Sequence, residues 1–153
     1  MLYKVPRTCT FNPDEFSTES HDIAFFRESA AYVLLGDPGA GKTTLFEQEA
    51  ATSNGLYLSA RDFITFNRVD DWRNKTVFID GLDETRAGKD DAHTPLDAIR
   101  RKLDLLGRPR FRLSCREADW LGGNDQTALN ACVPNSKVTV LHLNALTDED
   151  IKV

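Results

Sequence analysis

The sequence lacks the features that would place the chain in a membrane or in an oxidising compartment. None of its 153 residues belongs to an apolar run of about 18, the length that spans a bilayer. The N-terminal segment, residues 1–7, has no apolar core of the kind found in signal peptides. The three cysteines, Cys9, Cys115 and Cys132, are an odd number without metal-ligand spacing. We therefore expect a cytoplasmic protein with reduced thiols.

An excess of positive charge is also missing. The chain has 19 Lys and Arg against 24 Asp and Glu, a net charge of −5, which argues against a nucleic-acid-binding surface. A chain of this length buries roughly 68–70% of its unfolded surface, enough for one self-standing core. We predict a core domain over residues 29–153, preceded by an arm over residues 1–28 that packs on it. Within the arm, Val5, Pro6 and Arg7 are candidates to cover a nucleotide base, although ordinary packing explains them as well.

The most informative stretch is a complete G-x-x-x-x-G-K-[ST] motif, the pattern of a phosphate-binding loop. An apolar run of strand length, Ala31 to Leu35, precedes it. A predicted helix from Thr43 to Ala51 follows and stops at Asn54-Gly55. The alternative is a glycine-rich turn with a chance lysine. The residues predicted to bind the cofactor are Gly36, Asp37, Pro38, Gly39, Ala40, Gly41, Lys42, Thr43 and Thr44.

Each residue type in this loop has a physical role. Glycines let the backbone turn its amide hydrogens toward an anion, and the N-terminus of the following helix adds partial positive charge. Lys42 supplies a full charge to the β- and γ-phosphates of a nucleotide. Thr43 offers a hydroxyl to Mg²⁺, which prefers oxygen ligands.

A second motif, Thr76 to Glu84, is an apolar strand that ends in acidic residues. A carboxylate at the end of a buried strand needs compensation, so we expect Asp80 to reach Mg²⁺ directly or through water. Asp83 or Glu84 could hold the attacking water. The alternative for these acids is a solvated turn.

A third strand, Phe111 to Cys115, ends in polar residues. If this strand inserts between the other two, Ser114 or Arg116 could sense the γ-phosphate; alternatively, Arg116 pairs with a surface acid. The predicted catalytic residues are Lys42, Asp83, Glu84 and Arg116, and the predicted metal ligands are Thr43 and Asp80.

The remaining segments carry weaker predictions. Residues 11–20 read as a polar surface run, residues 85–93 as a polar loop, and Gly122-Gly123 as a break. A helix capped by Thr94 should bury Leu96, Ile99, Leu103 and Leu106, and should expose Arg100, Arg101 and Lys102. The strand Lys137 to Leu143 alternates like an edge strand. Thr147 to Asp150 resembles the start of a helix, so we expect the chain to be a piece of a longer protein.

These motifs together resemble the NACHT branch of the STAND class of P-loop NTPases, and most closely its bacterial forms. The most specific point is the order Asp80-Gly81-Leu82-Asp83-Glu84, with a small residue after the metal acid and two acids further on. The resemblance covers residues 30–151. It implies an ATP/ADP switch that self-associates in a larger protein, between sensor and effector domains outside this chain, and many bacterial members act in defence against phage.

We therefore predict a three-layer α/β sandwich with a mainly parallel sheet of about five strands. The Phe111 strand should lie between the Val33 and Val77 strands, with the Val138 strand at one edge and the Leu56 strand at the other. The predicted function is a slow, magnesium-dependent regulatory ATPase. The alternatives are a nucleotide-dependent oligomerisation module without hydrolysis and, third, a small-molecule kinase that holds an acceptor at Arg61-Asp62.

Overall fold

The computed structural model describes residues 7–14, 16–37, 39–66, 69–87, 93–133 and 137–145. Pro38 and the predicted helix start at residues 147–150 lie outside these ranges. The strands are β1 (Thr8–Asp14), β2 (Ser17–Asp22), β3 (Ala31–Leu35), β4 (Leu56–Ser59), β5 (Val77–Asp80), β6 (Phe111–Cys115) and β7 (Thr139–Leu143). The α-helices are α1 (Lys42–Ser53), α2 (Ala60–Thr65), α3 (Leu82–Arg86), α4 (His93–Leu105) and α5 (Gly122–Asn130), and 3₁₀ turns cover Ile23–Phe26, Val69–Trp72 and Glu117–Asp119.

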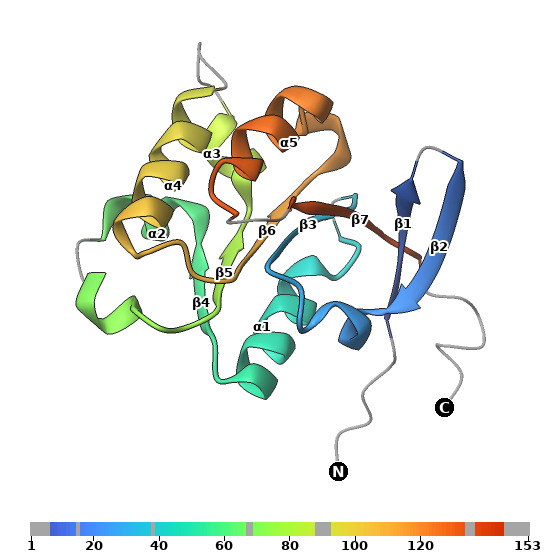
Figure 1. The fold of residues 1–153 in the computed structure, drawn as a ribbon, viewed down its shortest axis with the longest axis horizontal. Coiled ribbons are helices and arrows are strands. Elements are labelled where there is room, and N and C mark those ends of the chain that lie inside the picture. Colours follow the sequence, from blue (N-terminus) through green and yellow to red (C-terminus); the bar gives the residue numbers. More distant parts are fainter. Residues whose placement is uncertain are drawn as a thin grey trace.

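A seven-stranded sheet organises the chain, in the order β2-β1-β7-β3-β6-β5-β4. The five strands from β7 to β4 pair in parallel, whereas β1 pairs antiparallel with both β2 and β7. The predictions of about five strands and of the Val138 strand at an edge were therefore wrong. The β1–β2 hairpin extends the sheet beyond β7, so β7 is an interior strand between β1 and β3 (Figure 1).

Helices cover the two faces of the sheet and give the three predicted layers (Figure 1). Successive side chains of a strand point to opposite faces, so β3 contributes to two separate cores. Val33 and Leu35 pack with residues of α2, α4 and α5 on one face. Tyr32 and Leu34 pack with Leu45 and Phe46 of α1 on the other. The layering follows from this alternation in strands that are buried on both sides.

The helices that flank the motifs follow their sequence signals. The C-cap of α1 is Asn54 in the left-handed conformation, as the Asn-Gly stop predicts. In α4 the predicted apolar positions Leu96, Ile99, Leu103 and Leu106 are all buried.

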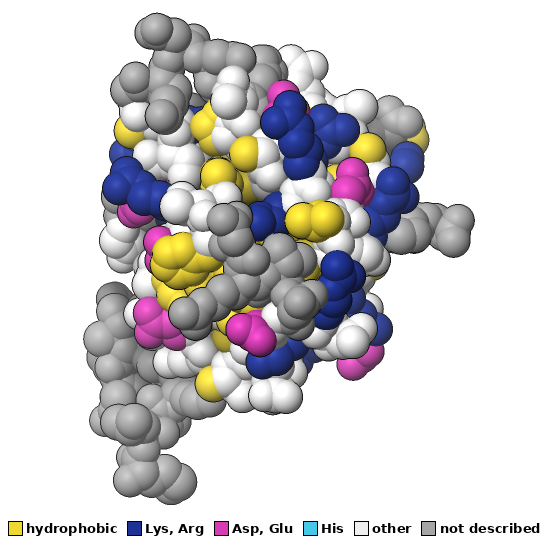
Figure 2. All heavy atoms as spheres, turned by 90° about the vertical axis from the view of Figure 1, so that its left-hand side faces the viewer, with side chains coloured by type: hydrophobic (Ala, Val, Ile, Leu, Met, Phe, Trp, Pro, Cys, Tyr) yellow, Lys and Arg dark blue, Asp and Glu magenta, His cyan; other side chains and the backbone are white. Residues whose placement is uncertain are grey.

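The predicted exposed face of α4 is partly wrong. Lys102 donates hydrogen bonds to the carbonyls of Ile64 and Phe66, and its ammonium lies 5.2 Å from the centroid of the Trp72 ring. Arg101 is exposed as expected. Figure 2 shows the α2–α4 side of the molecule, where apolar side chains lie next to both basic and acidic ones. Lys102 therefore links α4 to the end of α2 and to the Val69–Trp72 turn.

Two further segments differ from the sequence predictions. Residues 11–14 and 16–20 lie at the surface as predicted, but they form part of the β1–β2 hairpin, and Gly122-Gly123 begins α5 instead of only breaking the preceding turn. The hairpin is rich in polar residues because it lies at the edge of the sheet, where polar side chains can face water. Among the helices that the structure describes, none is long and apolar enough to cross a bilayer.

Candidate functional site

The predicted motifs meet at the carboxyl ends of β3, β5 and β6, which lie side by side in the sheet. A cavity of about 700 Å³ opens there. Such a position, outside the carboxyl ends of parallel strands, is where open α/β sheets bind ligands. The residues that line the cavity are Gly39, Ala40, Gly41, Lys42, Thr43, Thr44, Asp80, Gly81, Asp83, Glu84, Ala87, Ser114 and Arg116.

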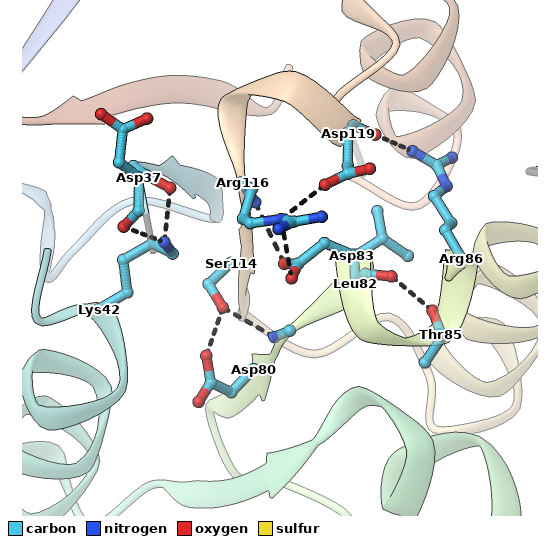
Figure 3. Close-up of polar contacts among 12 residues, drawn as sticks. Asp37, Lys42, Asp80, Leu82, Asp83, Thr85, Arg86, Ser114, Arg116 and Asp119 are labelled. Carbon is cyan, nitrogen blue, oxygen red and sulfur yellow. Dashed lines mark hydrogen bonds and ion pairs between the residues drawn. The ribbon is translucent and has the colours of Figure 1, made fainter. Parts of the chain in front are cut away.

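The glycine-rich loop leads directly into α1. Gly41 is the N-cap of α1 and has a φ of 97°, a left-handed conformation that favours glycine. The Lys42 ammonium donates to the backbone carbonyls of Gly36 (2.6 Å) and Asp37 (3.1 Å), as Figure 3 shows for Asp37. Lys42 is therefore held over the loop, next to the N-terminus of α1, where positive charge converges.

The outer members of the predicted loop do not face the cavity. Gly36 is buried at the end of β3, and its amide donates to the Cys115 carbonyl of β6. Asp37 is exposed, and its carbonyl accepts from the amide of Ala40 and from Lys42. These two residues shape the loop, while residues 39–44 line the cavity.

Asp80, at the end of β5, is the polar centre of the site. One carboxylate oxygen accepts hydrogen bonds from the Thr43 hydroxyl (2.7 Å) and the Tyr57 hydroxyl (2.6 Å). The other accepts from the Ser114 hydroxyl at 2.5 Å. Donors from α1, β4 and β6 thus fix one carboxylate between them, which lowers the cost of placing its charge at the end of a buried strand.

Ser114, predicted as a γ-phosphate sensor, lines the cavity and is hydrogen-bonded to Asp80. Its side chain is fully buried, and its oxygen also accepts from the amide of Gly81 at 2.8 Å (Figure 3). It joins the end of β6 to Asp80, the last residue of β5, and to Gly81, which follows it. This geometry makes Ser114 a support for Asp80.

Gly81 turns the chain from β5 into α3. It has a φ of 88°, and the amide of Glu84 donates to its carbonyl. An added Cβ would lie 3.4 Å from the Glu84 carboxyl carbon. The small residue after Asp80 therefore lets α3 start at once and brings the two following acids to the cavity.

The two acids are held unequally. Asp83 accepts from the Arg116 amide at 3.1 Å, and its carboxylate lies 3.5 Å from the Arg116 guanidinium. Glu84 is exposed and also lines the cavity. Arg116 itself points between Asp83 and Asp119, 2.7 Å from the latter (Figure 3). The alternative of an ion pair with a surface acid thus describes Arg116 in this structure, although its side chain remains at the cavity wall.

The oxygen atoms of Thr43 and Asp80 suit Mg²⁺ as metal ligands. A hydroxyl and a carboxylate oxygen of Thr43 and Asp80 lie 2.7 Å apart at the cavity, and hard oxygen ligands are what this ion prefers. No cluster of three or more His, Cys, Asp and Glu side chains with metal-binding geometry occurs within the described part of the chain. A magnesium ion here would accordingly take its other ligands from water and phosphate, as is usual for nucleotide sites.

Sequence reasoning missed Tyr57 and Arg86 near the site, and it assigned Arg7 to a nucleotide base instead of the loop. Tyr57 reaches Asp80 from β4, and burial, followed by the Asp80 hydrogen bond, raises the pKa of its hydroxyl so that it stays a donor. Arg7 donates to the carbonyl of Ala40 in the loop. Arg86 of α3 forms a buried ion pair with Asp125 of α5. No local pattern marks these contacts, because each joins residues far apart in the chain.

Comparisons with known proteins assign no family. No family model matches the chain, and no curated protein matches it either. Among solved structures, one described as the structure of C. elegans PCH-2 is similar, with 16% identity and a TM-score of 0.38. The match covers 72% of this chain and 35% of that one, so the chain spans about a third of the neighbour's length. A TM-score this low supports no functional argument, so the assignment depends on the site itself.

Proposed function

We propose that this chain is a magnesium-dependent nucleotide-binding module that hydrolyses ATP slowly and acts as a regulatory switch. The observation that carries the proposal is the contact between Thr43 of the glycine-rich loop and Asp80 of β5. It brings the two motifs of a P-loop NTPase to one cavity, with Lys42 on the loop beside them.

The residues would divide the work by charge and position. Loop amides and Lys42 would bind the β- and γ-phosphates, and Thr43 and Asp80 would hold Mg²⁺, which neutralises charge on the phosphates. Glu84 is the better placed acid to orient water, since the Asp83 carboxylate is already engaged by Arg116. Without an arginine finger, turnover of such sites is of the order of 10⁻⁴ s⁻¹.

The finer identity is part of the same proposal. The resemblance to bacterial NACHT domains supports ATP as the nucleotide, self-association in the full-length protein, and a role in defence against phage. Sensor and effector parts would belong to segments outside this chain.

One observation favours the alternative of a module that does not hydrolyse. Three acids of the second motif line the cavity: Asp80, Asp83 and Glu84. Asp80 is the proposed metal ligand and Asp83 accepts a hydrogen bond from Arg116, which leaves Glu84 as the acid available to orient water. If Glu84 does not position water, the site would bind nucleotide and assemble without turnover.

Magnesium dependence tests the proposal. Asp80→Asn should retain nucleotide but lose most of the increase in affinity that Mg²⁺ gives the wild type. Asp71→Asn, at an exposed acid, is the control and should behave as wild type. Equal Mg²⁺ dependence in Asp80→Asn and wild type would contradict the assignment of the metal site.

Hydrolysis is tested separately under single-turnover conditions. Glu84→Gln should bind ATP as tightly as wild type and convert it to ADP at least about tenfold more slowly, as expected for a lost general base. Wild-type conversion that Glu84→Gln leaves unchanged would contradict the role of Glu84. Binding without any conversion in the wild type would support the alternative module.

A further inference from the structure

Arg7 contacts the glycine-rich loop from outside the cavity lining. It precedes β1, and a single terminal nitrogen of its guanidinium donates to the carbonyl of Ala40 (2.9 Å) and to the carbonyl of Asn144 (3.1 Å). Arg7 is not among the residues that line the cavity. One side chain therefore bridges the phosphate loop and the chain just after β7.

The contact constrains the peptide that joins Ala40 to Gly41. No cis peptide occurs among the described residues, and in a trans peptide the carbonyl and the following N–H point in opposite directions. Holding the Ala40 carbonyl against Arg7 therefore aims the Gly41 N–H away from Arg7, and Gly41 itself lines the cavity whereas Arg7 does not. Inward-pointing amides are what binds phosphate in such loops.

Gly41 also makes room for this contact. A Cβ added to Gly41 would lie 2.7 Å from the second terminal nitrogen of Arg7, closer than real Cβ atoms approach other groups. Both hydrogen-bond acceptors of Arg7 among the described residues are neutral carbonyls, so its charge also adds to the positive potential at the loop.

Asn144, the second residue that Arg7 contacts, is hydrogen-bonded to the β1–β2 hairpin. The Asn144 side chain accepts from the Thr10 hydroxyl (2.8 Å) and donates to the hydroxyls of Thr8 (3.0 Å) and Ser20 (2.9 Å). The backbone amide of Asn144 donates to the Thr8 carbonyl. Asn144 thus joins β7 to both strands of the β1–β2 hairpin.

We propose that Arg7 is a positioning residue that orients the phosphate loop and couples it to the junction of β7 with the β1–β2 hairpin. The inference rests on the proposed nucleotide site and adds a route by which bound phosphate stabilises a distant part of the sheet. Coupling is reciprocal, so whatever disturbs the Asn144 junction should weaken nucleotide binding in turn.

The test compares Mg-ADP binding and amide hydrogen exchange in the full chain and its variants. Arg7→Ala should bind about tenfold more weakly, the effect of losing about 1.4 kcal/mol of a charge-assisted contact. In the wild type, Mg-ADP should slow exchange in the loop and also in β1 and β7. In Arg7→Ala the slowing should be confined to the loop and α1. A merely structural arginine would lower stability without changing which strands the nucleotide protects.

The controls separate this inference from the proposed function. Arg101→Ala, at an exposed arginine of α4, should match wild type in both measurements. Absence of binding by the wild type would overturn the proposed function, and this inference with it. Wild-type binding with unchanged affinity or unchanged strand protection in Arg7→Ala would overturn this inference alone. If Arg7→Ala does not fold, Arg7→Lys carries the test: weaker binding is expected because an ammonium lacks the planar guanidinium, and wild-type values would overturn the inference.

Discussion

At the scale of single residues, the site depends on how one carboxylate is compensated. Asp80 accepts hydrogen bonds from three hydroxyls, those of Thr43, Tyr57 and Ser114. Two of the three come from strands that the sequence places far from Asp80. The loop lysine and the acid at the end of β5 can be predicted from motifs, but the groups that hold that acid in place cannot.

Removing the hydroxyl group of Ser114 should lower the free energy of unfolding considerably, although the change is only one atom. Ser114→Ala leaves the Gly81 amide without its acceptor and removes a donor from Asp80, in a fully buried position. We expect a loss of about 1–3 kcal/mol in the free energy of unfolding, measured by urea denaturation. Ser17→Ala, in the exposed hairpin, is the control and should change stability by less than about 0.5 kcal/mol. A neutral Ser114→Ala would contradict its role as a support for Asp80.

Gly81 gives a second prediction at this scale. Gly81→Ala must place a Cβ at a φ of 88° and close to Glu84, so we expect it to destabilise the fold by about 1–2 kcal/mol. Gly123→Ala in α5 meets no atom within 4 Å, and helix propensity favours alanine there by up to about 1 kcal/mol. Thermal melts of both variants should move in opposite directions; a shift in the same direction would contradict this account of the turn.

At the scale of elements, α3 is fixed by a partner that the sequence does not reveal. The Arg86 guanidinium forms two hydrogen bonds with Asp125 of α5, at 2.8 and 2.9 Å, and a third with the Asp119 carbonyl (2.8 Å). Asp125 also accepts from the Leu121 amide. This buried network holds the helix that carries Asp83 and Glu84 against the rest of the domain.

Removing one partner of the Arg86–Asp125 ion pair should destabilise the fold strongly. Asp125→Ala leaves the Arg86 charge buried without its carboxylate, which costs about 3–5 kcal/mol in comparable cases. Asp104→Ala removes an exposed partner of Arg108 and should cost less than about 1 kcal/mol. Urea denaturation of the two variants measures the contrast, and equal losses would show that the buried network contributes no more than a surface pair.

The elements that could be predicted are those with a strong apolar period. The strands β3 and β6 and the buried face of α4 were predicted, because their buried residues form apolar runs or an apolar helical spacing in the sequence. The hairpin was not, since β2 exposes most of its residues and reads as a polar run. The start of α5 was missed because glycine pairs usually end helices.

At the scale of the whole molecule, the two cores enclose thiols that resist ionisation. Burial raises the pKa of Cys9 and of Cys115 from the usual 9.0 to about 12. Below pH 9 both folded and unfolded chains keep these protons. Above it the unfolded chain releases them first, so the stability that depends on the protonated thiols is lost as pH rises toward 12.

The free energy of unfolding should therefore be flat near neutral pH and fall above about pH 9, by up to about 1.4 kcal/mol per pH unit for each thiol. Urea denaturation at a series of alkaline pH values measures the slope. The pair Cys9→Ala and Cys115→Ala lowers overall stability but should make the slope shallower. A slope that is the same with and without the thiols would contradict this explanation.

The sheet order among β3, β6 and β5 is what unites the site, since it places the loop, Asp80 and Ser114 at one edge. The sequence predicted that meeting point from its motifs, whereas the hairpin and its link through Arg7 come from long-range pairing. Whether the meeting point binds nucleotide is the central claim, and it is tested most directly by equilibrium binding of ATP, ADP and GTP with Mg²⁺. Wild type should bind adenine nucleotide, Lys42→Ala should not, and Lys75→Ala, at an exposed lysine, should bind as wild type. Absence of binding by the wild type, or equal binding by Lys42→Ala, would contradict the account.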